Sequence, residues 1–529
     1  MPFYIVQHGT NVSLVNTSGT ATVLTLPTGV TVSDDVPPRF AIWRREVVMV
    51  NSPSEPIAIN SQGDVRILTP IAPPTAPVIA GTGAGNLTGV YQVKVSFYIK
   101  DEFGTLLSES GLSPVSNSVT LTAQILRATN IPISAQDVSG RRLYRTTAGG
   151  SVFFPWIDVD GNVVTTAQGD LTDAAMELVS APTNLGTGPD LSIVCEWRGR
   201  LWGADKDNID SLRRTAADTS FAWDPDLEFE VPPVGRDRRG ITSLVKRRDE
   251  LGVGKWDSFQ MVTGNDDDNF TLVQVAEQIG VVSHESVQVV DDEAFFLGAP
   301  YGVYKWMDGG IVNISDEKVK AWFSTDTYFN RAMFEFSKSN YDPVYKIYIL
   351  HLAAAGSTVN DRWIYYDIEG DQWYGPHKTD EFTPTAAGFL TTEEDNPLPT
   401  IGSSNGFLWR NQATRTDGAS TPVDMDVDTS FMCGTPPAPD IDKAFLELGV
   451  ISKIQPTGLP KILTITPKVG GLDATAQTAI LHDMTLGRER LPRLGAPGRF
   501  AQLNFRQATA DTDVVLYGFE IPYFELGRR

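Results

Sequence analysis

Hydrophobic and polar residues alternate along the chain in short runs that are typical of β-strands. The runs Phe40–Val50, Val90–Ile99, Val344–Leu352 and Ile462–Val469 are rich in β-branched or aromatic residues and end at Gly, Pro, Asn or Asp. Such runs between turn residues predict strands. The best helical candidates are short and cover Ala123–Arg127 and Asp316–Phe323. A chain of 529 residues with so little helix is expected to consist of sandwiches, barrels or propellers.

Tryptophan residues recur at nearly even intervals in the middle of the chain. Trp202, Trp256, Trp306, Trp363 and Trp409 are separated by 54, 50, 57 and 46 residues, and apolar runs and turns lie between them. A unit of about 50 residues is the period of a β-propeller blade of the kelch size class. The alternative is that Trp residues fall evenly because the strands are rich in aromatic residues. We favour propeller blades, and Trp43 marks one more unit before the series.

Breaks in this pattern predict four domains. Pro70–Gly85 is a linker-like segment rich in Pro, Gly and Ala, and a second such segment covers Ser180–Asp190. The strands between them predict an inserted sandwich of the immunoglobulin or fibronectin type III kind. After Cys433 the Trp residues stop, and Phe500, Leu503 and Phe505 are separated by polar residues in a clearly alternating run. This C-terminal β-layer is either a separate sandwich or the piece that closes the propeller.

The predicted fold class is therefore all-β. The expected domains are strands and a first blade at 1–71, the inserted sandwich at 72–182, the remaining blades at 183–435 and the C-terminal β-domain at 436–529.

Charge and cysteine content restrict the functions that this chain can have. There are 43 Lys and Arg residues against 65 Asp and Glu residues, which gives a formal net charge of −22. This balance counts against a protein whose main task is to hold nucleic-acid phosphates or an anionic membrane surface. Cys195 and Cys433 cannot form a disulfide framework, so we expect assembly in a reducing compartment. No run approaches 18 apolar residues, which excludes a spanning helix.

Candidate catalytic and metal-binding residues are scattered. The sequence contains no HExxH or paired CxxC spacing, no GxSxG elbow and no GxxxxGK[ST] loop. Gly81–Gly85 (GTGAG) precedes a strand and is therefore expected to be a linker instead of a phosphate-binding loop. The five histidines are isolated from one another, and we expect each to be structural or exposed. They are His8, His284, His351, His377 and His482.

Three carboxylate clusters are candidate metal sites: Asp266–Asp268, Asp291–Glu293, and the alternating Asp424, Asp426 and Asp428. Alternate residues of a strand lie about 6.5–7 Å apart, too far for one cation without further ligands. A solvated acidic face is the favoured interpretation. Asp158 begins a calcium-like loop, but Val163 occupies the glycine position, so a hairpin turn is expected there. We expect no cofactor and no metal.

One basic segment stands out at Arg236–Lys255. It could contact DNA or the acidic face of a neighbouring subunit, although a charged run is more often a solvated surface. The candidate contact residues are Arg236, Arg238, Arg239, Lys246, Arg247 and Arg248, with Lys255 at the end of the segment.

The order of these elements resembles the β-propeller tail proteins of tailed bacteriophages, in particular the nozzle or tail tubular components of short-tailed phages. The residues that carry the resemblance are Arg39–Trp43 leading into Val47–Leu68, the sandwich end Arg141–Gly150, the restart at Trp197–Gly203 with Ser220–Pro225, and the C-terminal segments Pro497–Gln507 and Gly518–Arg529.

The resemblance implies a structural, non-enzymatic protein of the virion tail, assembled in the host cytoplasm. It would form a ring, commonly of six copies, through which DNA passes without specific binding. Its partners would be itself and other tail proteins, such as the adaptor and fibres. The alternative function is an adhesin-like or lectin-like propeller that binds a glycan or receptor through exposed Trp and Tyr.

Overall fold

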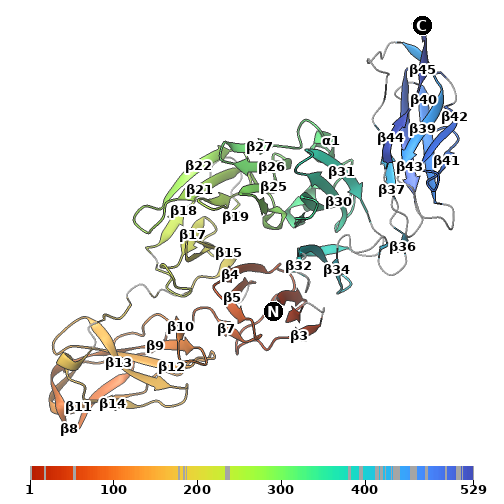
Figure 1. Ribbon diagram of the computed structural model, residues 1–529. Coiled ribbons are helices and arrows are strands. Elements are labelled where there is room, and N and C mark those ends of the chain that lie inside the picture. Colours follow the sequence, from red (N-terminus) through yellow and green to blue (C-terminus); the bar gives the residue numbers. More distant parts are fainter. Residues whose placement is uncertain are drawn as a thin grey trace. The chain divides into compact units, whose positions relative to one another are not determined.

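The computed structural model describes residues 3–16, 20–51, 55–176, 179–182, 185, 188–224, 226–232, 239–378, 383–391, 397–410, 416–417, 421–422, 425–429, 432, 441–452, 461–470, 475–494, 497–507, 514 and 516–527. These residues form two compact units. The first contains residues 1–378 and 382–409, and the second contains residues 379–381 and 410–529. Both are built from antiparallel β-strands, which confirms the predicted all-β class (Figure 1).

Seven antiparallel sheets of the first unit follow one another along the described chain and form the propeller. Sheet I contains β1 (Phe3–His8), β2 (Asn11–Asn16) and β3 (Ala21–Val23), and sheet II contains β4 (Arg39–Trp43), β5 (Glu46–Val50), β6 (Ile57–Asn60) and β7 (Val65–Ile67). Sheet III contains β15 (Leu191–Trp197), β16 (Arg200–Asp205), β17 (Ser211–Arg214) and β18 (Glu228–Glu230), and sheet IV contains β19 (Ser243–Lys246), β20 (Leu251–Gly254), β21 (Ser258–Thr263) and β22 (Thr271–Glu277).

The later sheets continue the series (Figure 1). Sheet V contains β23 (Gly280–Val281), β24 (Gln288–Val290), β25 (Glu293–Ala299), β26 (Gly302–Met307) and β27 (Gly310–Asn313), with η2 (His284–Ser286) between β23 and β24. Sheet VI contains β28 (Lys338–Asp342), β29 (Ile347–Ala353), β30 (Asn360–Asp367) and β31 (Gln372–His377), preceded by α1 (Lys320–Ser324) and η3 (Arg331–Phe336). Sheet VII contains β32 (Pro384–Thr391), β33 (Pro397–Ser403) and β34 (Leu408–Arg410).

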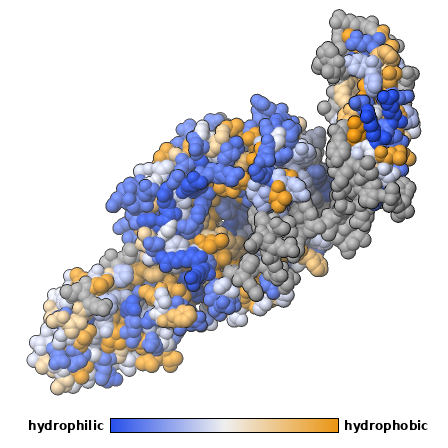
Figure 2. Space-filling model, in the orientation of Figure 1, coloured by the Kyte–Doolittle hydropathy of each residue, from blue (hydrophilic) through white to orange (hydrophobic). Residues whose placement is uncertain are grey.

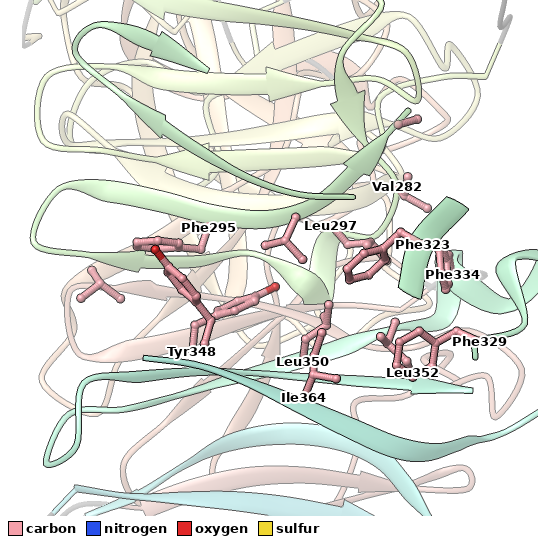
Figure 3. Close-up of a cluster of buried hydrophobic side chains, with 14 residues drawn as sticks. Val282, Phe295, Leu297, Phe323, Phe329, Phe334, Tyr348, Leu350, Leu352 and Ile364 are labelled. Atoms are coloured by element: carbon pink, nitrogen blue, oxygen red, sulfur yellow. The ribbon is translucent and has the colours of Figure 1, made fainter. Parts of the chain in front are cut away.

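The apolar cores of the propeller lie between consecutive sheets. Strands of sheets II to V contribute side chains from both faces, so each of these sheets takes part in two clusters, whereas sheet VI contributes to the cluster that it shares with sheet V. Figure 3 shows the cluster between sheets V and VI, in which Phe295 and Leu297 pack against Tyr348, Leu350 and Ile364. Because a sheet with two apolar faces must be covered on both sides, the sheets stack side by side as propeller blades.

The contact between sheets VI and VII is polar where it is described. Asn340 of β28 donates hydrogen bonds from Nδ2 to the carbonyl oxygens of Gly388 (2.7 Å) and Thr400 (3.1 Å). Its Oδ1 lies 3.0 Å from Nε2 of the buried His351. Burial lowers the pKa of His351 to about 3, so this imidazole is neutral at physiological pH and Nε2 donates to Asn340.

The predicted period of about 50 residues reflects the sheets, but the Trp residues are not equivalent. The first strands of sheets III to VII begin at residues 191, 243, 280, 338 and 384. Trp202 lies in the second strand of its sheet, whereas Trp363 and Trp409 lie in third strands. Trp256 lies in the turn between β20 and β21. The even spacing therefore indicates the blade size without marking one repeated position.

The inserted sandwich lies between β7 and β15 and contains two sheets. One has the order β10-β9-β12-β13 and the other the order β14-β11-β8. Their shared core includes Val95, Leu121, Leu126 and Leu143. The strands are β8 (Val78–Tyr91), β9 (Val93–Lys100), β10 (Leu106–Glu109), β11 (Val119–Thr129), β12 (Gly140–Thr146), β13 (Phe153–Asp160) and β14 (Ala167–Gly169), followed by η1 (Asp173–Ala175).

Two predictions in this region were wrong. Ala123–Arg127 is part of β11 and is not helical, and Gly81–Gly85 is part of β8 and is not a linker. The pairing of β8 with β11 contains register shifts on both sides of Gln124. A Cβ atom at Gly85 would lie 2.6 Å from the backbone nitrogen of Ile125. Glycines are therefore needed where the irregular strand approaches its neighbour closely.

The helix expected at Asp316–Phe323 is shorter than predicted. Only α1, at Lys320–Ser324, is an α-helix in this range, and Val319 at its N-cap makes no side-chain hydrogen bond that would stabilise the helix start.

The second unit is a separate β-sandwich. Its main sheets have the orders β37-β43-β40-β41 and β42-β39-β44, and Leu448, Ile465, Leu503 and Phe505 pack between them. In β43 the residues that face the core are Ala501, Leu503 and Phe505, so Phe500 lies on the opposite face. The strands are β35 (Thr416–Asp417), β36 (Thr421–Pro422), β37 (Met425–Asp428), β38 (Asp442–Phe445), β39 (Glu447–Ser452), β40 (Ile462–Gly470), β41 (Ile480–Asp483), β42 (Arg488–Arg493), β43 (Phe500–Gln507), β44 (Leu516–Glu520) and β45 (Tyr523–Gly527).

Replacing Trp202 by Ala should reduce the free energy of unfolding by about 3–5 kcal/mol, because this side chain is fully buried between sheets III and IV. Urea denaturation followed by circular dichroism measures the effect. Trp363→Ala is the control, since Trp363 is only half-buried and should cost clearly less. Equal losses for the two variants would contradict the assignment of Trp202 to the inter-sheet core.

Candidate functional site

Polar side chains from four sheets meet where the inner edges of the propeller sheets converge. In a propeller the sheets are arranged radially around a central axis. We call Arg39, Ser243, His284, Glu285 and Lys338 the axial cluster. Arg39 begins β4, Ser243 begins β19 and Lys338 begins β28, while His284 and Glu285 form part of η2. The cluster therefore joins sheets II, IV, V and VI.

Glu285 is the centre of the axial cluster. Its Oε1 lies 2.9 Å from Nη2 of Arg39, and its Oε2 lies 3.6 Å from Nζ of Lys338. Ser339 also donates a hydrogen bond from Oγ to the backbone oxygen of Glu285 (2.9 Å). The carboxylate is thus held between two cations that come from different sheets.

Burial and the two cations control the protonation states in the axial cluster. Burial raises the pKa of Glu285, but the charges of Arg39 and Lys338 outweigh this effect and hold it below the usual value. Burial and, to a smaller extent, the positive charge of Arg39 lower the pKa of His284 to about 4. Nδ1 of this neutral imidazole lies 3.2 Å from Oγ of Ser243. At neutral pH the axial cluster contains two cations, one carboxylate and an uncharged histidine.

A cleft of about 540 Å³ opens beside the end of β4. Phe40 and Ile42 supply exposed apolar side chains to it, with exposed fractions of 40% and 73%. Cys195 also lines this cleft, and burial raises the pKa of its thiol to about 12. A thiol with such a pKa is protonated at neutral pH and is a poor nucleophile. Charged residues complete the lining, namely Arg44, Glu196, Asp218 and Lys246.

Arginines in the first turn of three consecutive sheets form ion pairs with the next sheet. We call Arg44, Arg198 and Arg247 the turn arginines. Arg44 and Arg198 each follow a Trp residue at the end of the first strand and have a positive φ of 53°. The ion pairs are Arg44–Asp218 (3.5 Å), Arg198–Asp249 (2.8 Å) and Arg247–Asp292 (3.6 Å).

Arg247 is the most buried turn arginine, with 4% of its side chain exposed. Its Nη1 lies 2.8 Å from Oε2 of Glu250, and Nε donates to the backbone oxygen of Asp292 at 2.6 Å. The guanidinium also pairs with Asp308 and lies 4.7 Å from the centre of the Trp306 ring. Arg247 therefore connects sheet IV to sheet V, and its side chain is buried in the protein.

Most of the predicted basic residues that the structure describes have partners within the fold. Arg239 lies over the Trp256 ring at 3.7 Å, Lys246 pairs with Glu196, and Lys255 is buried with its Nζ 2.6 Å from Oδ1 of Asp210. Arg248 is exposed. Arg236 and Arg238 lie outside the described residues. In the sequence, an arginine directly follows the residue that ends the first strand in Trp43-Arg44, Trp197-Arg198 and Lys246-Arg247. This recurring position could have identified the turn arginines.

Carboxylates of the expected acidic clusters serve as partners for arginines. Asp267 pairs with Arg200 at 3.1 Å and with Arg214, and both arginines are buried. Burial raises the pKa of Asp267, but the hydrogen bond from Arg200 and the charge of Arg214 more than offset it, so the pKa is lowered. The surface over β18, β21 and β22, close to this pair, is largely hydrophilic (Figure 2).

The remaining candidate ligands lie in several different places of the chain. Asp158 pairs with Arg142 at 2.7 Å, Asp424 lies outside the described residues, and Asp426 and Asp428 fall in β37. Within the described ranges, no group of three or more His, Cys, Asp or Glu residues is placed to hold a metal ion. The described helices are all too short or too polar to cross a membrane.

Comparisons with known proteins give only distant resemblances. No protein-family model matches the sequence, and no curated protein sequence matches it significantly. The WD40 β-propeller domain of Doa1 is 8% identical and covers 54% of this chain and 87% of its own, with a TM-score of 0.25. PorZ, a surface component of the type-IX secretion system of Porphyromonas gingivalis, is 9% identical over 99% of this chain and 75% of its own, with a TM-score of 0.28.

An exo-β-1,3-galactanase from Phanerochaete chrysosporium is 9% identical and covers 62% of this chain and 95% of its own, with a TM-score of 0.21. At these identities and TM-scores the resemblances support no functional assignment, and the description of the fold rests on the sheet topology.

Asp267→Asn should lower the free energy of unfolding by about 2–3 kcal/mol, because Arg200 and Arg214 would keep their buried charges without a carboxylate. The partial exposure of Asp267 keeps the loss below that of a fully buried pair. Chemical denaturation at pH 7 measures it. The matched control is Asp268→Asn at the neighbouring exposed residue, which should change stability by less than about 0.5 kcal/mol. Similar losses in both variants would refute this role for Asp267.

His284 should make the protein less stable as the pH falls from about 6.5 to 4. In this window the unfolded chain binds a proton at His284 that the folded protein excludes, because the pKa of His284 is lowered to about 4. Between pH 7 and pH 5 the wild type should therefore lose about 1–2 kcal/mol more than His284→Gln. Denaturation curves at both pH values test this, and an identical pH dependence of the two proteins would contradict it.

Proposed function

We propose that this chain is a structural component of a bacteriophage tail that assembles into a ring of identical copies. The ring provides a channel for genome ejection and surfaces for other tail proteins. The proposal starts from the order of elements, in which propeller sheets I and II precede an inserted sandwich, sheets III to VII follow it, and a β-sandwich unit ends the chain. That order resembles the nozzle proteins of short-tailed phages.

The observation that carries the proposal is the axial cluster. A propeller that binds a ligand at its axis needs polar groups that are available to the ligand. Here Arg39 of sheet II and Lys338 of sheet VI instead neutralise Glu285 of sheet V. Because these side chains bind one another and are not free for a ligand, we expect the conduit for DNA to lie between copies of the chain.

The charge of the chain agrees with such a conduit. Each copy carries a formal charge of −22, and the described basic residues at 239–255 are largely paired with carboxylates or stacked on a Trp ring. A wall that makes several phosphate contacts would hold DNA with a steep salt dependence. A channel without such contacts lets the genome slide.

The experiment is electron microscopy of the purified protein combined with light scattering. Six copies of 57.7 kDa should give a closed ring of about 350 kDa. The assembly should not retain duplex DNA at about 150 mM salt. A stable monomer at micromolar concentration, or tight and salt-sensitive DNA binding through residues 236–255, would overturn the proposal.

A second candidate function is recognition of a glycan or receptor. It is favoured by the cleft with Phe40 and Ile42 and by the exposed aromatic residues Tyr345 and Tyr374 of sheet VI. Aromatic side chains of this kind offer flat apolar surfaces to sugar rings. A glycan array with the wild type and a Tyr345→Ala/Tyr374→Ala variant separates the candidates, because only the receptor function predicts binding that this variant loses while it keeps its fold.

A further inference from the structure

In the second unit, two hydrogen bonds connect the side chains of a serine, a histidine and a glutamate. Oγ of Ser452 lies 3.0 Å from Nε2 of His482, and Nδ1 of His482 lies 2.8 Å from Oε2 of Glu489. Ser452 ends β39, His482 lies in β41 and Glu489 lies in β42, so the three residues come from both main sheets of this unit. We infer that Ser452, His482 and Glu489 form a nucleophilic triad for transfer of short aliphatic acyl groups from esters.

The two hydrogen bonds determine which tautomer of His482 is present. Glu489 accepts the proton on Nδ1, so in the neutral ring Nε2 carries the free electron pair and faces the hydroxyl group of Ser452. Glu489 also accepts a hydrogen bond from the backbone nitrogen of Asp483 at 3.3 Å, which orients its carboxylate. A base that is held in this tautomer by a third group is the arrangement that activates a serine.

The triad lies directly below the turn between β41 and β42. Ser452 is 3% exposed and His482 is fully buried, whereas 30% of the Glu489 side chain is exposed. The backbone nitrogen of Ser452 donates to the carbonyl oxygen of Gly487 at the end of this turn (2.6 Å). Leu481 and Leu486, on either side of the turn, expose apolar side chains. Because Ser452 and His482 are buried, a reaction at Ser452 requires this turn to move aside, and the two exposed leucines would then favour an aliphatic acyl group.

The reaction needs only the ester and water. A bond forms between Oγ of Ser452 and the acyl carbon while the hydroxyl proton moves to Nε2 of His482. The ester C–O bond then breaks, and the alcohol leaves with that proton. Water, deprotonated by His482, attacks the acyl-serine and releases the carboxylic acid, which restores Ser452. Glu489 is a positioning residue that keeps the imidazole in place and stabilises its charged form.

The propeller supplies an internal control for this inference. Ser243 and His284 also lie within hydrogen-bond distance, at 3.2 Å, but the contact uses Nδ1, and burial together with the neighbouring cations keeps the pKa of His284 near 4. This pair has a weak base and no carboxylate that orients the ring, so Ser243 should not react.

The test is covalent labelling of the full chain with a small alkyl fluorophosphonate, followed by intact mass and peptide mapping. One label should appear on Ser452, with loss of fluoride, and none on Ser243. Ser452→Ala and His482→Gln should abolish labelling. Glu489→Gln should slow it by at least about tenfold, and Glu489→Asp should restore part of the rate, which a purely structural carboxylate would not require.

Hydrolysis of p-nitrophenyl butyrate should follow the same order of variants. Thermal unfolding establishes that each variant is folded. Folded wild-type protein that takes up no label, or that is labelled equally in Ser452→Ala, would overturn the triad and leave an inter-sheet hydrogen-bond network. This outcome is independent of ring formation, so the failure of one proposal does not decide the other.

Discussion

The propeller depends on one constraint, which is that most of its sheets have two apolar faces. Sheet V shows this directly, because Phe296 points into the cluster shared with sheet IV and its neighbour Phe295 points into the cluster shared with sheet VI. Successive residues of a strand face opposite sides of a sheet. A single sheet of this kind cannot be stable in water, so each blade is stable only when its neighbours are present.

Ion pairs connect specific sheets in addition to this apolar stacking. The turn arginines connect sheet II to III, III to IV and IV to V, always from one sheet to the next in the chain. In the axial cluster, the pair of Arg39 with Glu285 connects sheets II and V, which are not neighbours, and the pair of Lys338 with Glu285 connects the neighbouring sheets V and VI. Exposed pairs such as Arg44–Asp218 contribute little to stability. Loss of the partners of the buried Arg247, in contrast, would strongly destabilise the folded protein, because it would leave a buried charge unpaired. The same basic residues that suggest DNA contact in the sequence are thus largely used within the fold.

Much of the architecture could be predicted because it depends on local patterns. Alternating runs and turn residues predicted the all-β class, and the interval between tryptophans predicted the size of a blade. Local patterns failed where contacts distant in sequence decide the conformation. Ala123–Arg127 has helix-forming residues, yet it pairs with β8. The segment Ser110-x-x-Ser113-x-x-Ser116 joins β9 through hydroxyl groups that accept hydrogen bonds from Phe97, Val95 and Val93, a spacing of three that neither helix nor strand periodicity reveals.

The sequence by itself determined the all-β class, the acidic charge, the blade period and the absence of familiar catalytic motifs, because these depend on composition and short-range spacing. Only the tertiary structure decided which charges meet. Arg39 forms an ion pair with Glu285, which lies almost 250 residues further along the chain. Ser452 forms a hydrogen bond with His482, and His482 forms one with Glu489, each on a different strand. Hydrogen bonds and ion pairs need approach within about 3–4 Å. That distance is set by strand register and by the stacking of whole sheets, which no local stretch of sequence contains.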